Sequence, residues 1–351
     1  MRVTHKMMTS KYIRSVNDLS SGLNKLNDQI ITGRAFAKSS ENTAAAIKAF
    51  QIRRDLIRTE GYQANISHAQ SSLRNSESSL HHIGELVQIA KDRVIQSNTG
   101  TVSIDERRIV AKELKSIQES LIQSLNSNDS NAFYFGGTNT DVNPFTLMID
   151  PLDGKERLAY NGVLLNSIDD AQKEILSHEA MYVDIGLGVR TISVLVDPGN
   201  PTGPTKDIID PGTVFHYTIP GINITGNGTI TTSNGETISA NVYDLIGTIA
   251  DKLSSDSYSY DEVDELYGIL QEASMNVIYN ITEIGSKVSY LEFIEDRYEV
   301  RTLDQQERQL EIEGADPAEV IIHFKSQQVA YNAALQMGAK IIPPSIFNFM
   351  S

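Results

Sequence analysis

A seven-residue hydrophobic repeat, present in both halves of the chain, constrains the fold more than any other feature. In the first half, apolar residues recur at every seventh position, and smaller or apolar residues fill most of the intermediate positions. The seven-apart set is Ile66, Leu73, Leu80, Val87 and Val94; the intermediate set is Ala69, Ile83 and Ala90, with Ser76 as its polar interruption. Repeats sustained over several heptads predict long helices that pack as a coiled coil.

The second half carries the same repeat. Its seven-apart set is Val263, Leu270, Val277, Ile284, Leu291 and Tyr298; its intermediate set is Leu266, Ala273 and Ile294, with Asn280 and Lys287 as breaks. In the first half, one unbroken helix from Ala44 to Ser97 would be about 80 Å long, at about 1.5 Å per residue. Gly61 and Gly84 are expected to weaken that helix locally.

Two sequence patterns predict where further helices begin. Ser103 is followed three residues later by Glu106, which is the pattern of a capping box. Asp316-Pro317 places a capping acid before a proline at the first helical position, with Glu319 in the first turn. These patterns predict a second helix from about residue 104 and a final helix from about residue 317.

A narrower apolar stripe lies near each end of the chain. The first is Val16, Leu19, Leu23, Leu26 and Ile30; the second is Ile321, Phe324, Tyr331, Leu335 and Ile342. Helices of this modest length are marginal in water when isolated, and these two have no obvious core within the chain except each other. We therefore predict that both stripes are assembly interfaces, together with Phe347 and Phe349 in the apolar final segment SIFNFMS.

The middle of the chain, roughly 133 to 240, holds most of the Gly, Pro and Thr and predicts β-structure with long turns. Residues 221–239 alternate Ile and Thr around Asn-Gly pairs, which predicts a hairpin. The proline-rich residues 197–213 are expected to form an exposed loop.

Together these patterns predict a mainly α fold with a β-rich central domain. A long antiparallel helical coiled-coil bundle would be built from both chain ends, with a β insert in the middle. The expected domains begin with an N-terminal assembly helix and turn (1–42) and the first half of a long-helix core (43–140). A β-rich outer domain (141–240), the second half of the core (241–314) and a C-terminal assembly helix (315–351) follow.

Composition excludes several classes of function. The net charge of −15 argues against nucleic-acid binding, and the absence of cysteine removes disulfides, thiol nucleophiles and thiolate metal sites. The sequence contains no run of 18 apolar residues, so we expect no membrane-spanning helix. The first 16 residues lack the apolar region of a cleavable signal peptide.

The sequence shows no recognisable catalytic motif, so we predict that the protein is not an enzyme. His81 and His82 are adjacent on a predicted helix and face different directions, so we expect them to be exposed rather than to bind a metal. The FGGTNT stretch that begins at Phe135 lacks the Gly-Lys-Ser/Thr ending of a phosphate-binding loop. We expect no catalytic residue, no metal and no cofactor.

Three segments resemble the flagellin-like axial proteins of the bacterial flagellum. They are residues 20–56, with a Gly33-Arg34 turn; residues 132–145 with the later Ala159–Gly162; and residues 312–351. The most specific is the turn motif of the second segment, made of Phe135, Gly136, Gly137, Thr138, Pro144 and Phe145. Within the family, this motif is most similar to the proteins at the junction of hook and filament.

The resemblance implies a structural adapter that joins the hook, through the first junction protein, to the flagellin filament. The implied partners are further copies of the chain in a ring, the first junction protein, flagellin and an export chaperone. The implied location is the extracellular flagellum, reached by type III export. Two alternatives remain at this point: a flagellin filament subunit, and a secreted coiled-coil binding protein.

Overall fold

The structure is a computed structural model that describes residues 5–99, 102–129, 132–151, 153–195 and 205–341. The chain forms two compact units. The terminal unit comprises Met1–Glu60 and Tyr298–Ser351, and the central unit comprises Gly61–Arg297.

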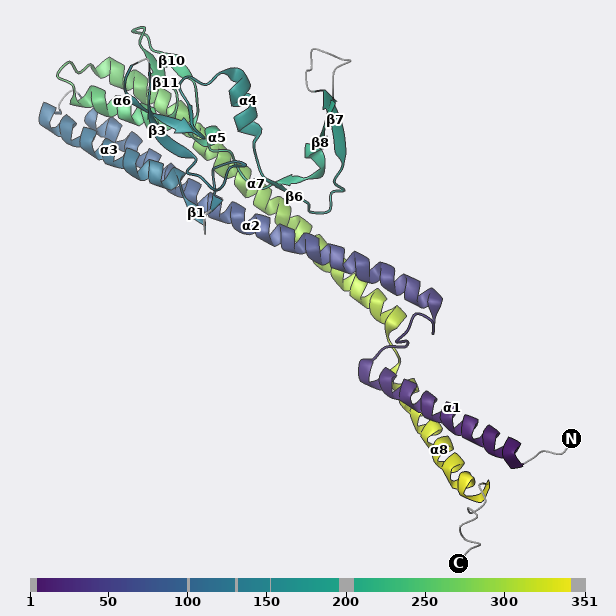
Figure 1. The fold of residues 1–351 in the computed structure, drawn as a ribbon. Helices are drawn as coiled ribbons and strands as arrows, with labels where there is room; N and C mark the ends of the chain where they lie inside the picture. The colour runs from purple at the N-terminus through teal and green to yellow at the C-terminus, as the bar shows by residue number, and fades with distance from the viewer. Residues whose placement is uncertain (1–4, 100–101, 130–131, 152, 196–204, 342–351) are drawn as a thin grey trace, which may run out of the picture. The chain divides into compact units, whose positions relative to one another are not determined.

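Helices dominate the described residues, and the predicted mainly α fold with a β-rich middle is confirmed (Figure 1). The helices are α1 (His5–Thr32), α2 (Thr43–Ser97), α3 (Ile104–Leu125), α4 (Asp170–His178), α5 (Ile222–Thr225), α6 (Val242–Ser254), α7 (Tyr260–Glu313) and α8 (Pro317–Ile341). Helix α2 runs without a break through Gly61 and Gly84, so the expected local weakening at these glycines does not interrupt it.

The heptad repeats form the core of the central unit. Every residue of the first repeat, from Ile66 to Val94, is buried on α2, including Ser76. On α7 the predicted positions are buried as well, with one exception: Lys287 is only partly buried and Val288 occupies the buried position instead. The repeat thus shifts by one residue there, which takes the ammonium group out of the core, where its desolvation would be costly.

The two buried polar residues of the repeats have hydrogen-bond partners. The Ser76 hydroxyl donates to the Ser72 carbonyl at 2.9 Å. The Asn280 side-chain amide donates to the Asn223 carbonyl at 3.0 Å and to the Asn276 carbonyl at 2.7 Å. Because a buried polar group without a partner is costly, these bonds explain how the core tolerates both breaks.

Helices α3 and α6 pack against each other in the central unit. The capping box predicted for α3 is present, since the Ser103 side chain accepts from the Glu106 N–H and the Glu106 carboxylate accepts from the Ser103 N–H. Asn241 caps α6, and the buried Asp244 carboxylate accepts from the Leu158 N–H at 3.1 Å. That bond ties α6 to strand β4 (Glu156–Tyr160).

The β-structure is divided into small antiparallel sheets. The strands are β1 (Asn128–Asp129), β2 (Ala132–Phe133), β3 (Phe145–Ile149), β4, β5 (Val163–Leu164), β6 (Tyr182–Val183), β7 (Thr191–Leu195), β8 (Thr205–Ile209), β9 (Phe215–His216), β10 (Thr229–Thr231) and β11 (Thr237–Ser239). Three strands form the sheet β3-β4-β5, and the others pair as β1-β2, β6-β9, β7-β8 and β10-β11.

Two predictions for the middle of the chain need correction. The hairpin expected over residues 221–239 is confined to β10 and β11, because residues 222–225 form the short helix α5. The expected loop over residues 197–213 contains strand β8, which pairs with β7. None of residues 205–209 is a proline, so every residue of that strand keeps its N–H group. Residues 197–204 of the expected loop lie outside the described residues.

Within the described ranges, no helix is both long enough and apolar enough to cross a bilayer.

Truncating Leu80 tests the heptad core. Leu80 is completely buried, so Leu80→Ala should lower the free energy of unfolding by about 3 kcal/mol, through lost burial and a cavity. Ile89 on the same helix is 47% exposed, and Ile89→Ala should change stability by about 0.5 kcal/mol or less. Urea unfolding followed by circular dichroism measures both; similar losses in the two variants would contradict the assigned register.

Candidate assembly interface

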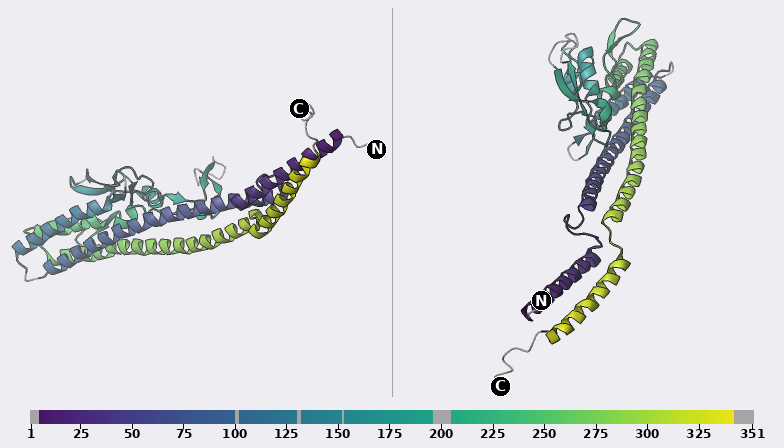
Figure 2. Two further views of the ribbon diagram at one scale, coloured as in Figure 1. Left: turned by 90° about the horizontal axis from the view of Figure 1, so that it is seen from below. Right: turned by 90° about the vertical axis from the view of Figure 1, so that its right-hand side faces the viewer.

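Helices α1 and α8 pair along their length in the terminal unit (Figures 1 and 2). On α1 the half-buried residues follow a heptad spacing, and on α8 the inner residues follow the same spacing. The inner residues are Tyr12, Val16, Leu19, Leu23 and Leu26 on α1, and Val320, Phe324, Gln327, Tyr331, Ala334 and Gly338 on α8. The pair is therefore a short coiled coil made from the two ends of the chain.

Hydrogen bonds and small residues fix the approach of the two helices. The Tyr12 hydroxyl donates to the Ala334 carbonyl at 3.0 Å, and the Gln327 side-chain amide donates to the Leu19 carbonyl at 3.4 Å. Gly338 lies against Tyr12 so closely that a β-carbon there would overlap the hydroxyl. This glycine is needed for close approach rather than for an unusual backbone angle.

The sequence prediction missed part of this contact. It named Val16, Leu19, Leu23 and Leu26 on α1, which do face inward, but omitted Tyr12. On α8 it named Phe324 and Tyr331, and the seven-residue step from these leads to Gly338. Extending the spacing to non-aliphatic residues would have found the missing members.

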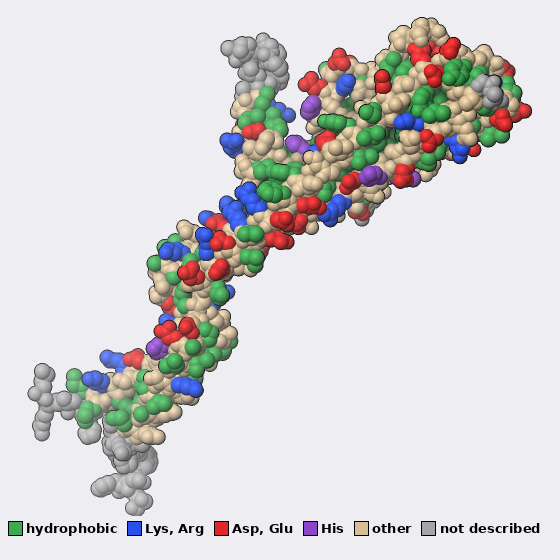
Figure 3. All heavy atoms as spheres, turned by 180° about the vertical axis from the view of Figure 1, so that it is seen from behind, with side chains coloured by type: hydrophobic (Ala, Val, Ile, Leu, Met, Phe, Trp, Pro, Cys, Tyr) green, Lys and Arg blue, Asp and Glu red, His purple; other side chains and the backbone are tan. Residues whose placement is uncertain are grey.

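Other predicted interface residues point away from the pair. Ile30, Ile321 and Leu335 are each more than two-fifths exposed, and Figure 3 shows hydrophobic side chains on the surface of this part of the chain. Further exposed apolar residues on the two helices are Met7, Met8, Ile13, Ile31, Ile322, Val329 and Met337. The predicted residues Ile342, Phe347 and Phe349 lie outside the described residues.

A short joint connects this pair to the beginning of α2 and the end of α7. Gly33 ends α1 in the left-handed region at φ +66°. The Ala35 N–H donates to the Glu313 carbonyl at 2.7 Å, and the Ala315 N–H donates to the Gly33 carbonyl at 2.9 Å. The two chain segments therefore break at the same level and are bonded to each other where they break.

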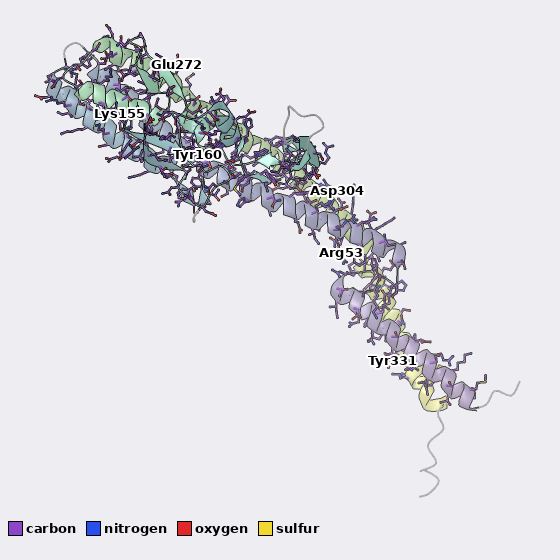
Figure 4. All side chains as sticks on the ribbon, turned by 45° about the horizontal axis from the view of Figure 1, so that its top comes forward. Arg53, Lys155, Tyr160, Glu272, Asp304 and Tyr331 are labelled. Carbon is purple, nitrogen blue, oxygen red and sulfur yellow. The ribbon has the colours of Figure 1, made fainter. Side chains whose placement is uncertain are left out.

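An ion pair lies beside this joint. Arg53 of α2 donates to the Glu313 carboxylate of α7 (Figure 4 marks Arg53). Burial alone would raise the pKa of Glu313, but the hydrogen bond and positive charge of Arg53, together with a hydrogen bond to Gln309 and the charge of Arg34, outweigh it, so the pKa lies below its ordinary value of 4.5. The pair thus favours the ionised carboxylate.

The turn motif of the resemblance is packed inside the central unit. Phe135, Gly136, Gly137, Pro144 and Phe145 are buried, whereas Thr138 is exposed. The Phe135 carbonyl accepts from the Tyr160 hydroxyl at 3.1 Å and from the Gly221 N–H at 2.9 Å. Burial raises the pKa of Tyr160 to about 12, which keeps this hydroxyl protonated as a donor.

The later Asn161-Gly162 forms the two-residue turn between β4 and β5. Both residues have positive φ, 48° for Asn161 and 81° for Gly162, which is the geometry of a type I′ hairpin. The Asn161 N–H donates to the Pro144 carbonyl at 2.8 Å. The two halves of the motif are therefore packed together within the β region.

Residues 3–140 match the family model of the bacterial flagellin N-terminal helical region. Two curated relatives, both named flagellar hook-associated protein 3, are 24% identical: one from Salmonella typhimurium over 52% of this chain and 56% of its own, one from Escherichia coli over 42% and 46%. The matches span about half the length of these relatives. The resemblance to hook-associated protein 3 in the flagellin-like family is confirmed.

Two solved structures share the fold. A flagellar hook-associated protein from Vibrio parahaemolyticus aligns with a TM-score of 0.56 and 20% identity, over 78% of this chain and 99% of its own. A hook-associated protein 3 from Legionella pneumophila aligns with a TM-score of 0.50 and 15% identity, over 75% of this chain and 99% of its own. At these identities the likeness concerns the fold.

Adding a side chain at Gly338 tests the close contact between α1 and α8. Gly338→Ala would place a methyl group against Tyr12, so it should reduce amide protection in α1 and α8 by about 1–3 kcal/mol, despite the higher helix propensity of alanine. Gly61→Ala on α2 is the matched control, because its new methyl group would meet open space; it should stabilise by about 0.5–1 kcal/mol. Hydrogen exchange of the full chain measures both, and stabilisation by Gly338→Ala would contradict the close approach.

The joint should also respond to acid. Since the folded-state pKa of Glu313 is lowered, the stabilisation by its ionised form is fully present above about pH 4.5 and is lost as the pH falls through the depressed folded-state value. The protection of the Ala35 amide, relative to the unstructured rate, should fall over that range. Glu313→Gln should show lower protection at pH 7 and little further change on acidification; an unchanged acid response would contradict the role of Glu313.

Proposed function

We propose that the chain is a non-catalytic structural adapter of the bacterial flagellum, which joins the hook, through the first junction protein, to the flagellin filament. The observation that carries this proposal is the incomplete burial of the α1–α8 pair, in which apolar residues lie on the outside as well as on the inner face. Apolar side chains that gather on the outside of a helix pair are normally buried in a larger assembly.

The comparisons support the particular assembly. Both curated relatives are named flagellar hook-associated protein 3, and the N-terminal part matches a flagellin helical region. The proposed partners are further copies of this chain in a ring, the first junction protein, flagellin, and a chaperone that covers the apolar helices before export. The proposed location is the extracellular flagellum.

The mechanism follows from the division of tasks along the chain. The outer faces of α1 and α8 would be buried between subunits, where each exposed apolar side chain would gain roughly 1.5–3 kcal/mol on full burial. The glycine-containing joint would set the direction of these helices through backbone hydrogen bonds. The heptad core would resist bending, and the β region would remain outside, where sequence variation is tolerated.

Co-sedimentation with isolated hooks tests the proposal. The purified chain should bind hooks that carry the first junction protein, should not form long polymers alone, and should permit filament growth when flagellin is added. Polymerisation without hooks would favour the alternative of a flagellin filament subunit. The match of residues 3–140 to a flagellin helical region is compatible with that alternative as well. If the chain neither binds hooks nor polymerises alone, that result would favour a secreted coiled-coil binding protein.

A charge on the outer face of α8 should separate assembly from folding. Leu335 is 46% exposed, so Leu335→Asp should leave the helicity of the free chain nearly unchanged but reduce hook binding at least about tenfold, because burying an unpaired carboxylate costs several kcal/mol. Asn332→Asp adds the same charge at an exposed polar position and should reduce binding less. Normal binding by Leu335→Asp would contradict the assigned interface.

A further inference from the structure

One strand in the central unit has an open edge. Strand β3 is the first in the sheet order β3-β4-β5, so only one of its sides is paired. Three consecutive apolar residues of this strand are at least 39% exposed: Leu147, Met148 and Ile149. Natural proteins protect such an edge with charged side chains, proline, bulges or a covering helix or loop, among other devices. Residues 145–149 contain no charged residue and no proline, although Pro144 and Pro151 flank them.

The hydrogen bonds of Phe145 show which backbone groups face the open side. Its N–H donates to the Asn126 side-chain oxygen at 3.0 Å, and its carbonyl accepts from the Asn126 amide at 2.9 Å. Phe145 therefore points its backbone away from β4. Because the direction alternates along a strand, Leu147 and Ile149 also point outward, while Thr146 and Met148 face their β4 partners Ala159 and Arg157.

The open groups are thus restricted to two residues. Asn126 closes the edge at Phe145, and no hydrogen bond within the described ranges joins the backbone of Leu147 or Ile149 to another segment. Beyond β3 the chain reaches Pro151, which has no N–H to donate. Two open residues separated by one closed residue are what a two-fold antiparallel contact requires.

We propose that β3 pairs with β3 of a second copy of this chain about a two-fold axis at Met148. Leu147 of each copy pairs with Ile149 of the other, which forms four backbone hydrogen bonds. Met148 then faces its own symmetry mate at a position where opposite side chains approach closely. All five residues of β3 are uncharged, so the pairing strand brings no like charges together in a chain whose net charge is −15.

This contact is separate from the proposed place in a ring. A ring is built from head-to-tail contacts between different surfaces, whereas a two-fold contact uses the same surface twice and stops at two copies. The β3 contact therefore belongs to the chain outside the ring. It can fail without affecting hook binding, and hook binding can fail without affecting it.

Because the sequence contains no cysteine, an introduced cysteine is the only thiol that can form a disulfide in a cross-linking test. Met148→Cys places a single thiol at the two-fold axis, where the separation of the β-carbons suits a disulfide. Under mild oxidation this variant should become a covalent dimer several times faster than Met275→Cys, a control at a methionine that is 61% exposed on α7. Equal rates would overturn the proposal.

The association itself should be visible by sedimentation equilibrium of the full chain. The unmodified chain should reach a monomer–dimer equilibrium at high micromolar concentration. Met148→Lys places two ammonium groups together and should weaken dimerisation roughly tenfold, while Met275→Lys should leave it unchanged. Circular dichroism checks that both variants keep their helices.

A chain that remains monomeric at these concentrations would overturn the second-copy assignment. A dimer that forms equally well with Met148→Lys would place the contact elsewhere on the molecule. Specific capture of an extended apolar peptide by the monomer would identify β3 as an edge for a different partner, and that result would also contradict the proposal.

Discussion

The structure depends on an imbalance in the burial of apolar side chains. In the central unit, the heptad faces of α2 and α7 are almost completely buried, and even their polar members have partners. In the terminal unit, α1 and α8 cover one face of each other and leave apolar residues outside. One region satisfies its hydrophobic surface within a single chain, and the other requires further molecules to do so.

The joint explains how one chain contains both regions. The α1–α2 and α7–α8 connections occur at the same level and are linked by two backbone hydrogen bonds. The Arg53–Glu313 ion pair adds a side-chain contact between α2 and α7 beside them. The two bonds pair the backbone groups of Gly33, Ala35, Glu313 and Ala315 at the point where the long helices meet the terminal helices.

Sequence reasoning predicted the fold well where a single periodicity dominates. The heptads identified the buried faces of α2 and α7, because burial of one helical stripe depends mainly on spacing. Prediction was weaker in the middle region, where α5 and β8 depend on tertiary packing and on which residues near a proline keep their N–H groups. Lys287 stood out as a break in the repeat, but the sequence did not show that Val288 takes the buried position one residue later.

The candidate interface was predictable in part for the same reason. Val16, Leu23 and Phe324 stand out as apolar residues at helical spacing, whereas Tyr12 and Gly338 act through a hydroxyl group and the lack of a side chain. Such contacts follow from close helix approach, which a hydrophobicity pattern does not show. The outward positions of Ile321 and Leu335 also required the structure, because they share the apolar character of the inner residues.

Hydrogen exchange of the full chain, free and bound to hooks that carry the first junction protein, tests most directly whether the terminal helices complete their burial in an assembly. Protection of α1 and α8 should rise strongly on binding, while the heptad core of α2 and α7 in the central unit should change little because it is already buried. Unchanged exchange in α1 and α8 of a hook-bound chain would contradict the assignment of these helices as the assembly interface.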